Sequence, residues 1–184
     1  MTCIAAIAEE GRVWIGADSA GVSGWSLTIQ RNPKVFRNGQ FLFGFTDSFR
    51  MGQLLAYALV PPERSADVTI ERFMATTFVD AVRVTLKEGG YARKEHDAET
   101  AGTFLVGYQG RLFRVCSDYQ VGESACGFDA CGCSEDVARG SLFTSRGLVA
   151  SPEDRLRLAL GAAESFSAGV RGPFNVLSIG GGDE

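Results

Sequence analysis

The chain has 184 residues, a length that favours one domain with a substantial hydrophobic core. Apolar residues make up 45% of it and charged residues 22%, which is ordinary for a globular protein and argues against long disordered segments. The net charge of -4 excludes the clustered positive charge that binding to nucleic acid requires, and no apolar run reaches the roughly 18 residues of a membrane span. We expect one domain over residues 1–184 with a flexible tail at 179–184, binding neither nucleic acid nor membrane.

The N-terminal part is typical of two β-hairpins followed by two helices. The expected strands cover 2–8, 12–18, 34–39 and 40–45, and the expected helices cover 48–59 and 68–90. Asn38-Gly39 favours a type I′ turn, because both central residues of that turn have positive φ. Asp67 is the expected N-cap of the second helix, which Gly89-Gly90 should end.

The C-terminal part repeats this order. A hairpin over 102–124 should turn at Gln109-Gly110 and continue into a strand near Val121. Ser134 and Ser151 are expected N-caps of helices over 134–145 and 151–169, and a strand over 174–181 follows. Because strands and helices come in blocks, the sequence predicts an α+β fold of two facing antiparallel sheets with helices outside.

Five cysteines, at positions 3, 116, 126, 131 and 133, form an odd set that favours reduced thiols in the cytoplasm. We expect no disulfide framework. The stretch "CGFDACGC" could suggest a metal site, but its spacing lacks paired C-x2-C ligands and His96 is the only histidine. We interpret it as a turn of small residues before a helix, and expect no metal.

The chemistry starts at Thr2. Met1 before a small residue is normally removed by methionine aminopeptidase, which would leave a hydroxyl and a free α-amine on Thr2. An α-amine has a pKa of about 7.7 to 8.0, so it can accept the hydroxyl proton as a general base. Asp18 and Lys34 lie at the ends of neighbouring strands and could come beside it, the lysine lowering nearby pKa values and the aspartate orienting the lysine.

Other interpretations of these residues stay open at this point. Taken alone, Asp18 could cap a turn and Lys34 could be a solvated hairpin residue. Cys3 could serve as nucleophile only if both preceding residues were removed, so we assign it to the core, pointing opposite to Thr2 by strand alternation.

Thr2, Asp18 in "GADS" and Lys34 in "NPKVF" have the spacing of the catalytic Thr, Asp and Lys of proteasome β subunits and HslV, which are N-terminal-nucleophile hydrolases. The stretch "GFTDSFRMGQLL" resembles this family's strand end and first helix. Similarly, "ACGCSEDVARGSL" resembles its Gly-Ser-Gly turn, and "AAESFSAG" its late Asp-x-x-Ser-Gly segment. The resemblance covers nearly the whole chain and implies a four-layer αββα sandwich.

The resemblance also implies further site residues. The backbone N–H of Asp47 takes the place of the oxyanion-hole donor, where a carboxylate would be unfavourable unless it points away. Cys133 and Ser134 stand where the family has its turn serine and the following glycine. Glu164 and Ser167 stand where the family has its late aspartate and serine.

The function that the resemblance implies is a threonine peptidase that cleaves peptides or unfolded proteins through an acyl-enzyme ester, without metal or organic cofactor. It implies a homo-oligomeric ring and an ATPase unfoldase as partner. Apolar helices over 52–59 and 73–82 could supply subunit contacts, although such stripes are more often core. Two alternatives are a small-amide hydrolase of the same superfamily and an inactive assembly or scaffold protein.

Overall fold

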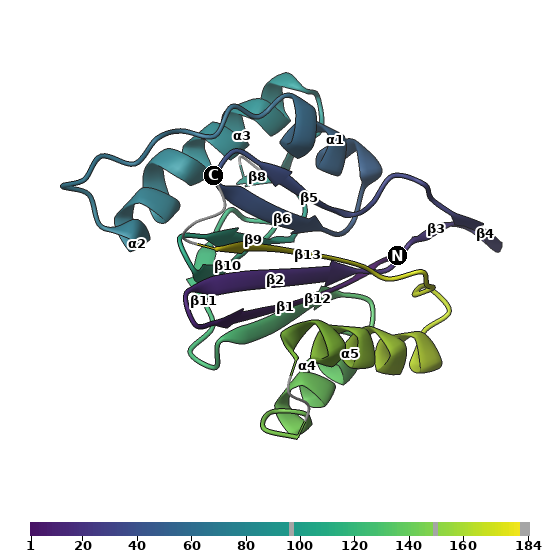
Figure 1. The fold of residues 1–184 in the computed structure, drawn as a ribbon. Helices are drawn as coiled ribbons and strands as arrows, with labels where there is room; N and C mark the ends of the chain where they lie inside the picture. Colours follow the sequence, from purple (N-terminus) through teal and green to yellow (C-terminus); the bar gives the residue numbers. More distant parts are fainter. Residues whose placement is uncertain (96–97, 149–150, 181–184) are drawn as a thin grey trace.

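Figure 1 shows the computed structural model of the chain, which describes residues 1–95, 98–148 and 151–180. Two antiparallel β-sheets lie face to face, and helices cover the outer face of each sheet. The α+β class and the four-layer αββα arrangement are therefore confirmed. Among the described helices, none is both long and apolar enough to cross a membrane.

The first sheet contains the chain's two opening strands at its centre, in the order β12-β1-β2-β13. Its strands are β1 (Cys3–Glu9), β2 (Arg12–Ala17), β12 (Phe128–Gly132) and β13 (Asn175–Gly180). Glu10 and Gly11 connect β1 to β2 with φ of 51° and 73°, so this hairpin has the positive φ values of a type I′ turn. The helices α4 (Glu135–Thr144) and α5 (Pro152–Phe166) cover the outer face of this sheet.

The second sheet has the order β11-β10-β9-β6-β5. Its strands are β5 (Val35–Asn38), β6 (Phe41–Phe45), β9 (Phe104–Tyr108), β10 (Arg111–Val115) and β11 (Val121–Glu123). The covering helices are α1 (Phe49–Tyr57), α2 (Ile70–Phe73), the π-helical turn η1 (Met74–Phe78) and α3 (Val79–Glu88). Two small hairpins, β3 (Ala20–Ser23) with β4 (Ser26–Ile29) and β7 (Arg93–Glu95) with β8 (Ala98–Thr100), lie outside the two sheets.

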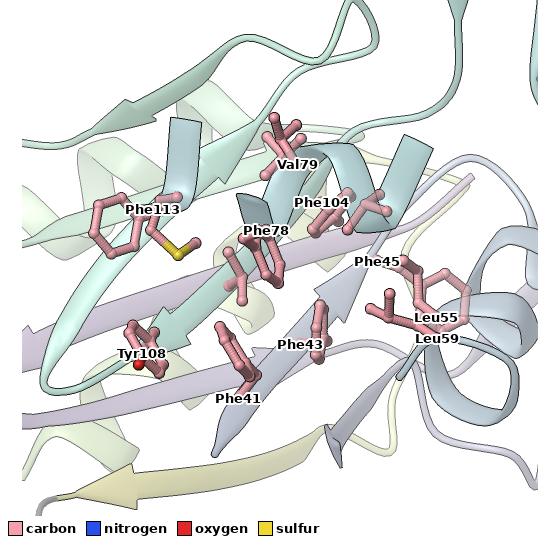
Figure 2. Close-up of a cluster of buried hydrophobic side chains, with 14 of the residues drawn as sticks. Phe41, Phe43, Phe45, Leu55, Leu59, Phe78, Val79, Phe104, Tyr108 and Phe113 are labelled. Atoms are coloured by element: carbon pink, nitrogen blue, oxygen red, sulfur yellow. The ribbon is translucent and has the colours of Figure 1, made fainter. Parts of the chain in front are cut away.

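Aromatic side chains fill the space between the second sheet and its helices (Figure 2). The ring of Phe41 stacks on Tyr108 at 4.4 Å between centroids and on Phe78 at 4.9 Å. Apolar residues of the 52–59 and 73–82 segments, including Leu55 and Phe78, point into this cluster. Most apolar residues of these two segments therefore form core, whereas Tyr57 is exposed.

The two sheets pack closely on one another through smaller side chains. A Cβ at Gly44 would lie 2.6 Å from side-chain atoms of both Ile4 and Ile15, so glycine is needed where β6 crosses β1 and β2. This close packing ties the start of β1, and with it the residues around Thr2, to the centre of the molecule.

Helix caps differ in part from the expected ones. Thr69, not Asp67, caps the second long helical segment by accepting a hydrogen bond from a first-turn N–H at 3.3 Å. Ser134 precedes α4 in the left-handed region with φ of 56°, and its hydroxyl caps no N–H of this helix. Ser151 caps α5 and Pro152 begins it, as predicted.

The turn between β5 and β6 is also different. Gly39 and Gln40 connect the strands, and Gly39 has φ of 57° while Gln40 lies outside the positive region, so the turn is not type I′. The Asn38 side-chain amide instead donates to the carbonyls of Leu55 and Leu59, each at 2.9 Å. Asn38 thus satisfies one carbonyl in the last turn of α1 and one just beyond the helix.

Three segments expected to be irregular are strands. Residues 128–132, interpreted as part of a turn, form β12 and pair with β1, and residues 93–95 and 98–100, expected as a polar connection, form a hairpin. The β3–β4 hairpin was not expected either. Ile179 and Gly180, assigned to a flexible tail, belong to β13, while His96 and residues 181–184 lie outside the described residues.

Candidate active site

Three strand ends converge on the candidate nucleophile. Thr2 immediately precedes β1, Asp18 immediately follows β2, and the antiparallel pairing of Ile4 with Ala17 brings these two ends together. Lys34 immediately precedes β5 and so comes from the second sheet, not from a neighbouring strand of the same sheet as expected. The three residues therefore meet between the sheets, where side chains are shielded from water.

Asp18 and Lys34 form a buried ion pair. Lys34 Nζ lies 2.9 Å from Asp18 Oδ1, and both residues are 0% exposed. The same carboxylate accepts hydrogen bonds from the backbone N–H groups of Cys3 (3.0 Å), Ala20 (2.9 Å) and Arg171 (3.3 Å). Asp18 thus caps the following turn and also fixes the lysine, whereas the interpretation of Lys34 as a solvated hairpin residue is wrong.

Burial sets the electrostatics of this pair. It lowers the pKa of Lys34 below the usual 10.5, because a desolvated ammonium is costly, and the attraction and hydrogen bond of Asp18 oppose that change. Lys34 Nζ also lies 3.5 Å from the carbonyl oxygen of Met1. The ammonium is therefore directed at the peptide bond that precedes Thr2.

Thr2 is held by its backbone while its hydroxyl contacts the preceding carbonyl. Its Oγ1 donates to the Met1 carbonyl at 2.6 Å, and its own carbonyl accepts from Cys133 N at 2.6 Å. Gly132 makes this approach possible, since it has φ of 95° and a Cβ there would lie 2.1 Å from the Thr2 oxygen. The turn before α4 is thus held against the backbone of Thr2.

Asp47 borders the same small pocket as Thr2, with its backbone in the left-handed region at φ of 62°. Its carboxylate accepts from Thr103 N at 2.7 Å, so the negative charge is tied to the start of β9. Within the described residues the N–H of Asp47 has no acceptor, whereas that of Ser48 donates to the Thr46 carbonyl. Asp47 N–H is therefore available to a developing oxyanion.

Cys133 and Ser134 reach the site mainly through their backbone. Cys133 contributes the N–H to Thr2, and its thiol is half-buried near Lys34 and Cys3. Ser134 itself adopts the left-handed backbone conformation at the turn into α4. In the described part of the chain, neither side chain is hydrogen-bonded to Thr2.

Glu164 and Ser167 support the loop behind the site. Glu164 accepts from Gly172 N at 3.1 Å, and Ser167 Oγ accepts from Gly169 N at 3.2 Å. A Cβ at Gly169 would lie 2.6 Å from the Met1 side chain, so this loop packs against the residue preceding Thr2. Across the described residues, the two side chains position this loop and make no hydrogen bond to Thr2.

Glu135 is a site-supporting residue that the sequence reasoning missed. Its carboxylate accepts from Gly132 N at 3.1 Å and forms ion pairs of 2.9 Å with both Arg114 and Arg139. The available signal in the sequence was the acidic residue Glu135 in the first turn of a helix, three positions after Gly132. The N–H of Arg171 was also missed, and a backbone donor of this kind has no signature in sequence.

The cysteines do not form a site of their own. Burial raises the pKa of Cys3 to about 12, with Asp18 adding to the effect, so its thiol stays protonated and packs in the core as expected. Cys131 is buried between the sheets, Cys133 faces the helices and Cys126 is exposed. Among the described residues, no group of three or more His, Cys, Asp or Glu could hold a metal ion.

An apolar pocket adjoins the small pocket at Thr2. Its walls include Phe36, Phe45, Phe49 and Tyr57, and both Phe45 and Phe49 also border the pocket that contains Thr2. The ring of Phe49 lies 5.8 Å from Lys34 Nζ. A chain bound at Thr2 could therefore place one apolar side chain between these rings.

The fold resembles those of solved proteasome-like proteins, whereas no protein-family model and no curated protein matches the sequence. BPH from Thiobacillus denitrificans, solved in complex with epoxomicin, is 22% identical with a TM-score of 0.80, over 97% of this chain and 98% of that one. HslV from Trypanosoma brucei is 15% identical with a TM-score of 0.69, over 98% and 100% of the chains. Anbu from Yersinia bercovieri is 13% identical with a TM-score of 0.66, over 97% and 82%. The chain thus has the proteasome-like N-terminal-nucleophile hydrolase fold.

Proposed function

We propose that this chain is a threonine peptidase whose nucleophile is the hydroxyl of Thr2. The observation that carries the proposal is the fully buried Asp18–Lys34 ion pair next to the start of β1. Its ammonium is directed at the peptide bond that precedes Thr2. A nucleophile of this kind needs a free α-amine as its base, so we further propose that the residue preceding Thr2 is removed.

The reaction begins with attack on the substrate carbonyl. The freed α-amine of Thr2 accepts the Oγ1 proton as the oxygen forms a bond to the carbonyl carbon, and Lys34 keeps the pKa values of amine and hydroxyl low through its charge. The N–H of Asp47 donates to the resulting oxyanion. The amine then returns the proton to the leaving nitrogen, which leaves an ester on Thr2.

Hydrolysis completes the cycle. The same α-amine accepts a proton from water as the water oxygen attacks the ester carbonyl, and the C–O bond to Thr2 breaks. The proton returns to the Thr2 oxygen and the carboxylic acid leaves. Asp18 acts throughout by holding the Lys34 ammonium in place, an arrangement supported by its four hydrogen bonds.

The substrates we propose are peptides and unfolded proteins with an apolar residue on the acyl side of the cleaved bond. The walls of the adjoining pocket, which include Phe36, Phe45 and Phe49, would bury such a side chain and gain about 25 cal/mol per Å² of apolar area. Five free thiols accord with a cytoplasmic location for this activity.

We also propose that copies of the chain assemble into a ring. The β3–β4 hairpin supports this, because Trp25, Leu27 and Ile29 are 104%, 44% and 50% exposed on an arm that projects from the body near the site (Figure 1). Active sites enclosed in a ring would need an ATPase unfoldase to deliver folded proteins. Trp25→Ser should weaken self-association in sedimentation runs, whereas Tyr57→Ser, at another exposed aromatic, should leave it unchanged.

The test of the catalytic proposal is intact-mass spectrometry before and after incubation with epoxomicin. We expect a mass that lacks Met1 and gains one inhibitor, mapped to Thr2. Thr2→Ala is the matched control, because methionine is also removed before alanine, so this variant loses only the hydroxyl. It should fold, remain unlabelled and cleave no peptide.

Other outcomes would redirect or overturn the proposal. Retained Met1 with no adduct would leave Thr2 without its base and favour a scaffold protein. Labelling at Thr2 with cleavage of small amides but not of denatured protein would favour a small-amide hydrolase. Full peptidase activity in Thr2→Ala would refute Thr2 as nucleophile.

A further inference from the structure

Another cavity lies at the opposite end of β1 from Thr2. Its volume is about 240 Å³, and it is lined by the end of β1, the residues leading into β12, Arg146 just beyond α4, and Arg155 of α5. Ile7 and Phe128 contribute apolar walls, and Arg146 and Arg155 contribute guanidinium groups. The cavity lies outside the site described above and does not rest on the proposed peptidase.

Arg155 is a charge buried with incomplete compensation. It is 5% exposed, and its Nη2 donates to the Leu142 carbonyl at 3.2 Å. Its single ionic contact in the described chain is from Nη1 to Glu9 Oε2 at 3.4 Å, longer than the 2.7 to 2.9 Å typical of such pairs. Its Nε, also within the described residues, is buried without a hydrogen-bond partner. A buried guanidinium in this state is costly unless another acceptor completes it.

The second guanidinium lies across the same cavity. Arg146 donates from Nη2 to the Cys126 carbonyl, and its guanidinium carbon lies 5.1 Å from the centre of the Phe128 ring. Glu9 is the only carboxylate among the described lining residues, and half of its side chain is exposed. The lining therefore carries two positive charges against one negative charge that can turn toward solvent.

We propose that this cavity binds a carboxylate whose hydrocarbon part packs on Ile7 and Phe128. A planar carboxylate can accept two hydrogen bonds from the paired N–H donors of a guanidinium. Its single negative charge also balances the net charge of +1 on the cavity lining. The apolar walls favour a hydrophobic carboxylate over inorganic phosphate. The carboxylate can belong to a free short-chain acid or to the C-terminus of a peptide, and the test separates these sources.

The experiment is isothermal titration calorimetry with three probes: sodium butyrate, the peptide Ala-Ala-Leu with a free C-terminus, and inorganic phosphate. The Thr2→Ala background prevents turnover of the peptide. We expect saturable binding of butyrate, of the peptide or of both, and whichever binds more tightly identifies the source. C-terminal amidation of the peptide should abolish its binding.

Variants place the binding in this cavity. Arg146→Gln removes an exposed charge and should weaken binding roughly ten- to hundred-fold, as expected for a lost charged hydrogen bond, while the fold is retained. Arg155→Met should abolish binding, and Arg157→Gln, an exposed arginine of the same helix, should leave it unchanged. The proposal is overturned by absence of saturable binding, by equal binding in Arg146→Gln, or by phosphate binding more tightly than either carboxylate.

Discussion

Replacement of Asp18 by asparagine tests the electrostatic design of the site. Lys34 is 0% exposed, and in the described chain Asp18 is its one ionic partner, at 2.9 Å. Removing the carboxylate charge leaves the ammonium buried and uncompensated, which typically costs about 3 to 5 kcal/mol. The new amide can also accept fewer of the hydrogen bonds that Cys3 N, Ala20 N and Arg171 N now donate. We therefore expect the free energy of unfolding to fall by an amount at the upper part of that range.

The assay is urea unfolding at pH 7 of four proteins: the parent, Asp18→Asn, Lys34→Met and the double variant. Because Lys34→Met removes the uncompensated charge, the double variant should be more stable than Asp18→Asn. Glu153→Gln, which breaks the exposed pair with Arg157, is the matched control and should change stability far less. A loss below about 1 kcal/mol in Asp18→Asn, or strictly additive losses in the double variant, would refute the assigned pairing.

The remaining predictions concern the same region. Burial lowers the pKa of Lys34 in the folded state, so between that pKa and 10.5 the unfolded chain binds more protons than the folded chain. The contribution of Lys34 to stability should therefore rise with pH across this range. Urea unfolding of the parent and of Lys34→Met measures it, and a difference in the free energy of unfolding that does not change with pH would contradict it. Gly132→Ala should cost more than about 2 kcal/mol, because its φ of 95° and the 2.1 Å approach to the Thr2 carbonyl exclude a Cβ. Gly140→Ala is the matched control in thermal melts of both variants, because Gly140 lies in α4 with open space around it, and it should be neutral or stabilising. Equal effects of the two substitutions would argue against the close contact between Gly132 and the Thr2 carbonyl. Glu135→Gln should slow labelling of Thr2 by epoxomicin several-fold with little change in melting temperature, whereas unchanged labelling would limit Glu135 to a structural role.

The sequence reasoning was most successful where local pattern and chemistry agree. Apolar runs with short turns placed β1, β2, β6, β9 and β10, and the block order of strands and helices led to the layered fold. Thr2, Asp18 and Lys34 were found through their spacing, which resembles that of proteasome β subunits and HslV; the pairing of β1 with β2 joins Thr2 and Asp18, whereas Lys34 reaches them from the facing sheet. The roles of Asp47, Cys133, Ser134, Glu164 and Ser167 remain predictions, although the structure places all five in or around the same end of the molecule.

What the sequence left out depends on long-range contacts. Three of the five residues of β12, Asp129, Ala130 and Gly132, have weak strand propensity, and the segment is a strand because β1 offers an unpaired edge. The β3–β4 hairpin was missed although Ser26–Ile29 alternates polar and apolar residues; every residue of β4 is exposed, so the hairpin does not pack on the core of the domain. Arg171 N and Gly172 N act through their backbone, which any residue other than proline provides.

The position of Thr2 directly before a central strand whose first five residues are buried determines how the site can move. Cys3, Ile4, Ala5 and Ala6 are 0% exposed and hydrogen-bonded to strands on both sides, so their amides should exchange with solvent deuterium only through global unfolding. The geometry around the hydroxyl therefore persists for as long as the whole molecule stays folded. Heat inactivation should therefore coincide with the cooperative unfolding of the domain, and no local unfolding at a lower temperature should abolish activity first.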